Sequence, residues 1–187
     1  ESTITGNYAR AFLWTSGGGM TSLGTLGGTY SAARGINDNG QVVGISSVSG
    51  DVSVLAFLWT PGTPGVMQNL DTLPGSPRST AVGINNAGQV VGYAEDSGGG
   101  NERAFRWISG SGMTDLGTLT GGSDSAAVSI NTAGLVVGSA VDSDGNQRAV
   151  RWTSEGVITA LGALPGGSYS SASSINTAGL VVGSADV

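Results

Sequence analysis

The chain of 187 residues contains no cysteine and no histidine, and all seven of its basic residues are arginine. These absences exclude disulfide bonds, thiolate or imidazole zinc sites, a Cys nucleophile and a Ser-His-Asp triad. Charged residues make up only 11% of the chain, and the formal net charge is −6, which argues against nucleic acid and anionic membrane surfaces as partners. No apolar run approaches the roughly 18 to 20 residues of a membrane-inserted helix.

Glycine is abundant, with 34 residues, and hydrophobic residues make up 39% of the chain. This composition differs from the low hydrophobicity and high charge of disordered chains. The chain starts at Glu1, without an initiator Met or a basic-then-apolar signal pattern, so we expect it to be processed or excised from a precursor.

Three short motifs recur in the same order along the chain. The first is typified by Ala-Phe-Leu-Trp, and its tryptophans, at intervals of 45, 48 and 45 residues, are Trp14, Trp59, Trp107 and Trp152. The second is an Ile-Asn-x-x-Gly turn before Val-Val-Gly, with its asparagines at Asn37, Asn85, Asn131 and Asn176. The third is typified by Leu-Gly-Thr-Leu. Asn and Gly favour tight turns and Val favours strands, so each unit predicts four short strands.

Four strands in about 47 residues are typical of a β-propeller blade. We therefore predict an all-β, four-bladed propeller in one repeat domain spanning residues 1–187. Its units are residues 31–78, 79–124, 125–169, and 170–187 completed by 1–30. The last blade would be shared between the N- and C-terminal strands.

The two chain ends match in phase. If Val187 were joined to Glu1, the interval from Trp152 to Trp14 would be 49 residues and that from Gly179 to Gly40 would be 48. This match predicts a closed monomeric ring, favoured by the high effective concentration of tethered ends. The same arithmetic fits a chain that donates its N-terminal strands to the next subunit, which would give a fibre.

Together the three motifs resemble the HAF family of extracellular repeats, named for a His-Ala-Phe tripeptide, and the resemblance covers essentially the whole chain. The position of the family's His is filled here by Arg10, Leu55, Arg103 and Arg148. The resemblance implies a secreted or surface-attached bacterial or archaeal protein, and it supplies no catalytic residues.

Several residues are candidates for binding. Asp142, Asp144 and Asn146 have the alternating oxygen ligands of a calcium loop, or form an ordinary hairpin loop that lacks the downstream acidic ligand. Arg10, Arg103 and Arg148 recur in register and would bind anions or sugar acids, or else pair with nearby acids. Tyr30 and Tyr169 occupy the same place in their units and are candidates for stacking on sugars.

The recurring Trp and Asn residues are assigned structural roles, as core and as turn caps, although a ring of amides would also suit a ligand. The 13 acidic residues do not recur in register, so we expect no catalytic carboxylate pair and no enzyme. The sequence therefore predicts a non-catalytic, extracellular or cell-surface module for structure or binding, whose partner is a protein or a glycan. Alternatives are a lectin-like glycan binder and a strand-complemented fibre subunit. No cofactor is expected, apart from the calcium candidate.

Overall fold

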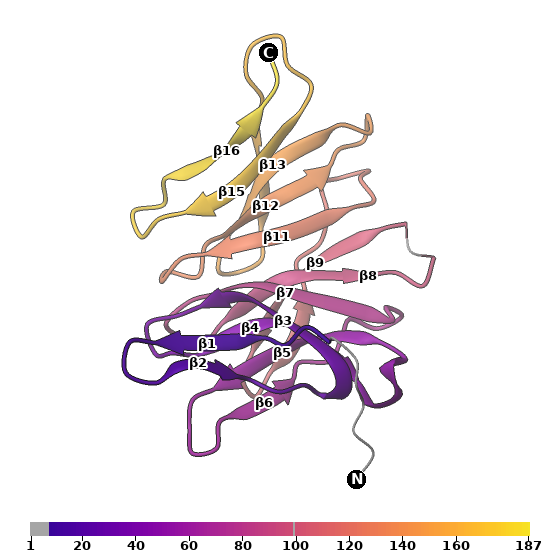
Figure 1. Ribbon diagram of the computed structural model, residues 1–187. Helices are drawn as coiled ribbons and strands as arrows, with labels where there is room; N and C mark the ends of the chain where they lie inside the picture. Colours follow the sequence, from indigo (N-terminus) through magenta and orange to yellow (C-terminus); the bar gives the residue numbers. More distant parts are fainter. Residues whose placement is uncertain (1–7, 99) are drawn as a thin grey trace.

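The computed structural model describes residues 8–98 and 100–187, which form antiparallel β-strands joined by tight turns (Figure 1). Three sheets have four strands each, and the strands follow chain order from one edge to the other. The first sheet contains β3 (Gly27–Ile36), β4 (Val42–Val48), β5 (Val54–Thr60) and β6 (Val66–Asn69). A short 3-10 turn, η1 (Ser49–Asp51), joins β4 to β5.

The second and third sheets repeat this order. The second sheet contains β7 (Arg78–Ile84), β8 (Val90–Glu95), β9 (Glu102–Ile108) and β10 (Gly112–Asp115). The third contains β11 (Ser125–Ile130), β12 (Val136–Val141), β13 (Gln147–Trp152) and β14 (Ile158–Gly162). The all-β class and the four-stranded units expected from the motifs are thus confirmed.

Two further sheets have only two strands. The N-terminal half-sheet consists of β1 (Phe12–Thr15) and β2 (Gly19–Ser22), and the C-terminal half-sheet of β15 (Ser170–Ile175) and β16 (Val181–Ala185). They lie at opposite ends of the molecule, with the three complete sheets between them (Figure 1).

The Asn-x-x-Gly segment forms the turn between the first two strands of each unit. In the first unit, the Asn37 side-chain oxygen accepts hydrogen bonds from the backbone N–H groups of Asn39 and Gln41. Gly40 closes the turn with φ of 72°, a conformation that glycine adopts at little cost. The motif therefore fixes where the first strand ends and the second begins.

The same cross-strand register recurs in every complete sheet. The first Val of each Val-Val-Gly lies opposite the motif tryptophan, in the pairs Val42–Trp59, Val90–Trp107 and Val136–Trp152. The Gly of this motif lies close to the backbone of the first strand. A Cβ atom on Gly92 would lie 1.9 Å from the Thr80 carbonyl oxygen, so only glycine fits there.

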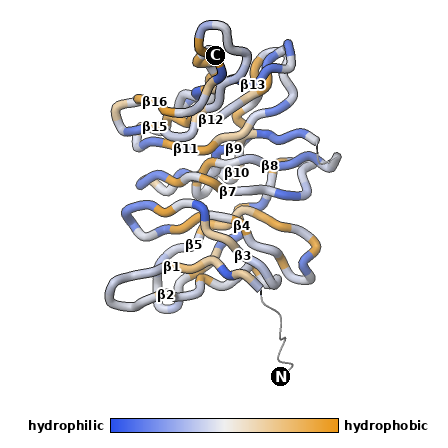
Figure 2. The backbone as a smooth tube through the Cα atoms, turned by 45° about the horizontal axis from the view of Figure 1, so that its top comes forward, coloured by the Kyte–Doolittle hydropathy of each residue, from blue (hydrophilic) through white to orange (hydrophobic). Residues whose placement is uncertain are grey.

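The core consists of apolar layers between successive sheets, and hydrophobic stretches lie along the strands (Figure 2). Between the first and second sheets, Val43 and Leu58 pack with Phe105 and Trp107. Between the second and third, Val91 and Leu116 pack with Val150 and Trp152. Smaller clusters join the N-terminal half-sheet to the first sheet and the third sheet to the C-terminal half-sheet.

The expected closed ring is not formed. Within the described parts of the chain, β1 pairs only with β2 and β16 only with β15, so the blade expected to be shared between the termini is divided into two separate half-sheets. Matching intervals establish that the ends are in phase, but they do not set the rotation from one sheet to the next. In this structure the rotation leaves the half-sheets at opposite ends of an open stack (Figure 1).

Candidate functional site

The recurring asparagines join successive sheets as well as capping their turns. Asn37 Nδ2 donates to the backbone carbonyl of Asn85 at 3.0 Å, Asn85 Nδ2 to that of Asn131 at 3.0 Å, and Asn131 Nδ2 to that of Asn176 at 3.1 Å. The first three asparagines are buried, at 4 to 8% exposure, whereas Asn176 is exposed. The amides of the first three asparagines are therefore occupied by contacts between sheets rather than open to a ligand.

A buried serine at or near the start of the first strand of each unit makes a second inter-sheet link. Ser125 Oγ accepts the Ala104 N–H of the preceding sheet at 3.0 Å and donates to the Gly117 carbonyl at 2.8 Å. The other members are Ser31, Ser79 and Ser170, which accept from Ala11, Ala56 and Ala149. Sequence reasoning missed this role, although the serines stand in register, each six residues before the asparagine of its unit.

The motif tryptophans differ in environment along the stack. Trp107 and Trp152 are buried, at 5% and 0% exposure, whereas Trp14 in the N-terminal half-sheet is 61% exposed. Trp59 is half-buried and packs with the cluster next to that half-sheet. Burial of this residue thus depends on a complete sheet being packed on the side that it faces.

The in-register arginines do not converge on a common site. Arg103 forms a 2.8 Å ion pair with Asp115 on the neighbouring strand, and Arg148 forms one of 2.8 Å with Asp142. Arg10 is exposed and lines a hollow of about 490 Å³ together with Tyr8 and Asp51. Two of the three guanidinium groups are thus engaged by local carboxylates.

The calcium candidate is a hairpin loop between β12 and β13. Asp142 Oδ1 accepts the N–H groups of Asp144 and Asn146, while Oδ2 accepts Arg148 Nε. The hydrogen bond from Arg148, followed by those from the loop backbone, lowers the pKa of Asp142. Across the described residues, no group of three Asp or Glu side chains is arranged to hold a metal ion.

Tyr30 and Tyr169 lie at equivalent positions near the two ends of the stack, and they are 37% and 39% exposed. Their backbone N–H groups donate to Ser47 Oγ and Asp186 Oδ1, respectively. Tyr30 belongs to the first complete sheet and Tyr169 precedes the C-terminal half-sheet. Since two complete sheets lie between these units, the structure does not bring the two rings into one site.

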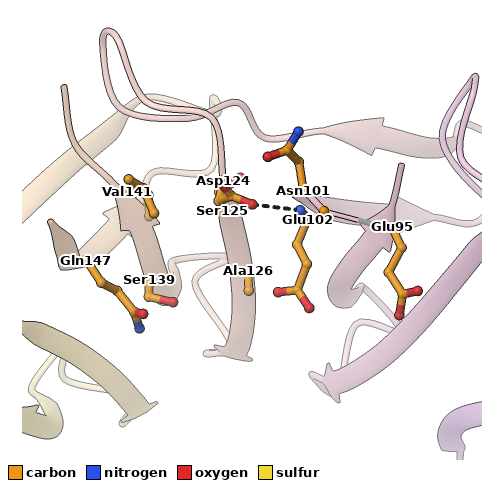
Figure 3. Close-up of a pocket in the computed structure, with 11 residues that line it drawn as sticks. Glu95, Asn101, Glu102, Asp124, Ser125, Ala126, Ser139, Val141 and Gln147 are labelled. Atoms are coloured by element: carbon orange, nitrogen blue, oxygen red, sulfur yellow. Dashed lines mark hydrogen bonds between the residues drawn. The ribbon is translucent and has the colours of Figure 1, made fainter. Parts of the chain in front are cut away.

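A polar cleft of about 480 Å³ lies between the second and third sheets (Figure 3). Carboxylates line it, from Glu95, Glu102 and Asp124, together with the amides of Asn101 and Gln147. Glu95 and Glu102 face each other across β8 and β9, and their carboxylates point to the same side (Figure 3). Asp124, just before β11, accepts the Glu102 N–H at 3.0 Å.

Burial and like charge act together on Glu102. Desolvation first, and then the carboxylates of Glu95 and Asp124, raises its pKa above the ordinary value. No basic or aromatic side chain is among the cleft-lining residues. The cleft therefore has a negative field that favours cations or hydroxyl-rich neutral molecules and repels anions.

Sequence reasoning missed this cluster because it looked for acids that recur from unit to unit. The register of the β8–β9 hairpin would have revealed the pairing of Glu95 with Glu102. Given the pairing of Val90 with Trp107, counting outward along both strands places Glu95 opposite Glu102.

The part of the chain that the structure describes contains no helix with the length and hydrophobicity of a membrane span. The sequence matches no protein-family model and none of the curated proteins with which it was compared.

Proposed function

We propose that this chain is a non-catalytic, extracellular or cell-surface repeat module with a structural or binding role. One observation carries the proposal: the polar residues that recur in every unit connect one sheet to the next. Asn85 and Ser125, for example, are 4% and 2% exposed and bond to backbone groups of an adjoining sheet. Recurring residues used in this way hold adjoining sheets together, and such a structural role requires no cofactor.

We further propose that the sheets are propeller-type blades and that the two half-sheets are parts of one blade. The chain-order arrangement of strands in each complete sheet supports this proposal, as does the face-to-face packing of successive sheets. Propellers and solenoids both bury the faces of their sheets by stacking repeated units.

Glycan binding is the second candidate, and the cleft between the second and third sheets favours it. Carboxylates and amides such as those of Glu102 and Asn101 accept and donate hydrogen bonds to sugar hydroxyls. The exposed ring of Tyr8 beside Arg10 offers another surface for a sugar, at the N-terminal end of the stack.

A glycan array probed with labelled protein, combined with a hydrolysis assay on the same glycans, tests these alternatives. The structural proposal predicts no saturable binding and no reducing ends released. Saturable binding that Glu102→Gln abolishes, and that the distant exposed substitution Glu155→Gln leaves intact, would favour the glycan binder. Hydrolysis abolished by Glu102→Gln would refute the non-catalytic assignment. Immunogold labelling of intact cells tests the surface location.

A further inference from the structure

Each half-sheet exposes a strand edge that is paired in the complete sheets. In those sheets the second and third strands pair with a Val opposite the motif Trp, as in Val136–Trp152. The equivalent residues in the half-sheets are Val181 on β16 and Trp14 on β1, and these two strands do not pair with each other. β16 therefore corresponds to the second strand of a complete sheet, but no third strand pairs with its free edge. β1 corresponds to a third strand, but no second strand pairs with it.

The N-terminal end exposes apolar side chains whose counterparts elsewhere are buried. Phe12 is 50% exposed, whereas Phe57 and Phe105 are 0% exposed. Trp14 and Ile36 are 61% and 57% exposed, although their counterparts Trp152 and Ile175 are 0% and 7% exposed. Phe12, Trp14 and Ile36 line or border a hollow of about 260 Å³ on the outer side of this end.

The C-terminal end shows the complementary pattern. Leu161 and Leu164 are 45% and 50% exposed, while their counterparts Leu70 and Leu73 are 2% and 6% exposed. In the interior, Leu70 and Leu73 pack in one cluster with Phe105 and Trp107 of the next sheet. By the same relationship, the residues that would cover Leu161 and Leu164 are a Phe and a Trp in the positions of Phe12 and Trp14.

Val182 on β16 extends the match. It is 65% exposed, whereas Val43, its counterpart in the first sheet, is 0% exposed and packs with Ala81 of the second. The residue equivalent to Ala81 is Ala33 of β3, which is exposed. Each end thus presents the contacts that the other end lacks.

The series of inter-sheet Asn hydrogen bonds stops at Asn176, which also indicates a missing unit at the C-terminal end. Three bridges connect Asn37 to Asn85, Asn85 to Asn131, and Asn131 to Asn176. Among the described residues, no acceptor is bonded to Asn176 Nδ2, and no inter-sheet amide donates to the Asn37 carbonyl. If the repeat continued, the Nδ2 group of Asn176 would donate to the backbone carbonyl of an Asn37 in the following unit.

We propose that the partner of each end is a second copy of this chain, joined head to tail. β1–β2 of one copy complete β15–β16 of another, with Trp14 opposite Val181 and Arg10 opposite Ala185. This inference rests on the proposed structural function and names its partner. It places Phe12 and Trp14 of one copy on Leu161 and Leu164 of the other.

A second copy fits better than the chain's own N-terminus because it requires no rearrangement. The two half-sheets lie at opposite ends of the stack, so closing a ring would change every sheet-to-sheet junction (Figure 1). A head-to-tail contact repeats the junction already present between sheets within the chain. Such a heterologous contact, if it does not close, generates a filament.

Paired cysteines test the junction, because the full 187-residue chain has no native cysteine. Residues directly opposite each other in an antiparallel pair lie within disulfide range. Arg10→Cys mixed with Ala185→Cys should give a disulfide-linked pair of chains, and the double variant should give a ladder of oligomers on oxidation. Arg10→Cys mixed with Ser109→Cys, in the β9–β10 turn, is the mismatched control and should not cross-link above background.

Sedimentation and electron microscopy of the unmodified chain provide the second measurement. We expect mass to rise with concentration, with head-to-tail oligomers or filaments in the images. Trp14→Ser should weaken association at least about 30-fold, as expected for a buried aromatic anchor, while Ser109→Glu, in an exposed turn of the second sheet, should leave it unchanged. Circular dichroism of each variant checks that it is folded.

A monomer at all concentrations would overturn the junction. So would a double-cysteine variant that oxidises within one chain, which would instead establish the closed ring. Either result leaves the non-catalytic assignment standing, since only turnover of a substrate refutes that.

Discussion

The side-chain amide of Asn85 donates a 3.0 Å hydrogen bond to the backbone carbonyl of Asn131 in the next sheet. The same amide donates to Gln89, while the Asn85 side-chain oxygen accepts from the N–H groups of Ala87 and Gln89. One buried side chain thus caps a turn within its own sheet and holds the neighbouring sheet in place.

Asn85→Ala should lower the free energy of unfolding by about 3 kcal/mol, because several buried hydrogen bonds are lost and their partners are left unsatisfied. Asn176→Ala is the matched control at the end of the stack. Its side chain accepts one hydrogen bond, from Leu180, so a loss of about 1 kcal/mol is expected for dilute monomer. Urea denaturation measures both, and equal losses would contradict the inter-sheet role of Asn85.

Gly92→Ala should destabilise the fold by about 3 kcal/mol or more, because the new methyl group would collide with the Thr80 carbonyl oxygen on β7. Gly17→Ala is the control, since no atom lies within 4 Å of the position of its Cβ and its φ is not positive. It should change stability by less than about 0.5 kcal/mol. A thermal melt of Gly92→Ala that matched the parent chain would show that the close strand contact is wrong.

Phe105→Ala should cost about 3 to 5 kcal/mol, since Phe105 is fully buried between the first and second sheets. Phe12 holds the equivalent position in the N-terminal half-sheet but is 50% exposed. Phe12→Ala should therefore cost less than about 1 kcal/mol in dilute monomer. Denaturant titrations at low protein concentration compare the two, and a loss for Phe12→Ala as large as that for Phe105→Ala would contradict the open stack.

Glu102→Gln should stabilise the fold by about 0.5 kcal/mol at neutral pH, because it removes a like charge opposite Glu95. The raised pKa of Glu102 means that the native state binds this proton more tightly than the unfolded chain does. The parent chain therefore loses stability as pH rises from the unfolded pKa, about 4.3, through the raised native pKa. The gain should disappear below the unfolded pKa.

Urea titrations of Glu102→Gln at pH 7 and at about pH 3.5 measure this difference. Glu155→Gln serves as control, because hydrogen bonds from Ser154 and Thr153 lower the pKa of Glu155, so no gain at neutral pH is expected. A gain for Glu102→Gln that persisted unchanged at the acidic pH would contradict the electrostatic explanation.

Millimolar calcium should not change the melting temperature. The side-chain oxygens of Asp142 are already bonded to Asp144, Asn146 and Arg148, so a cation would have to displace these contacts. A melt with and without calcium, with EDTA as reference, measures the effect. A saturable rise in melting temperature would instead establish a calcium site in this loop, and Asp142→Asn should then remove it.

The sequence predicted local structure well because each unit carries its own signals. Asn37 and Gly40 determine a turn, and the Val-Val-Gly and Ala-Phe-Leu-Trp motifs determine the strands on either side of the next hairpin. Four repetitions also revealed that the ends are in phase. Ring closure could not be read in the same way, because the rotation between sheets depends on how side chains such as Phe105 and Val43 pack, which residue intervals do not record.

The sites were less predictable than the strands. The turn-capping function of Asn85 follows from its residue type, but its bond to Asn131 requires the two turns to be side by side. The Glu95–Glu102 pair also depends on register, since six residues separate these acids in the sequence. The arginines were assigned by their recurrence, yet the partners of Arg103 and Arg148 occupy different places in their units.

In the described parts of the chain, apolar layers and the Asn and Ser bonds join each sheet to its immediate neighbours. Stability in such an array is approximately a sum of sheet and nearest-neighbour terms. The half-sheets, with one neighbour each, should fray first, and unfolding should travel inward from both ends. Amide hydrogen exchange should accordingly be slowest in β8 and β9, at the centre of the stack. Joining chains end to end would convert these frayed ends into interior positions, so that assembly itself would raise resistance to unfolding.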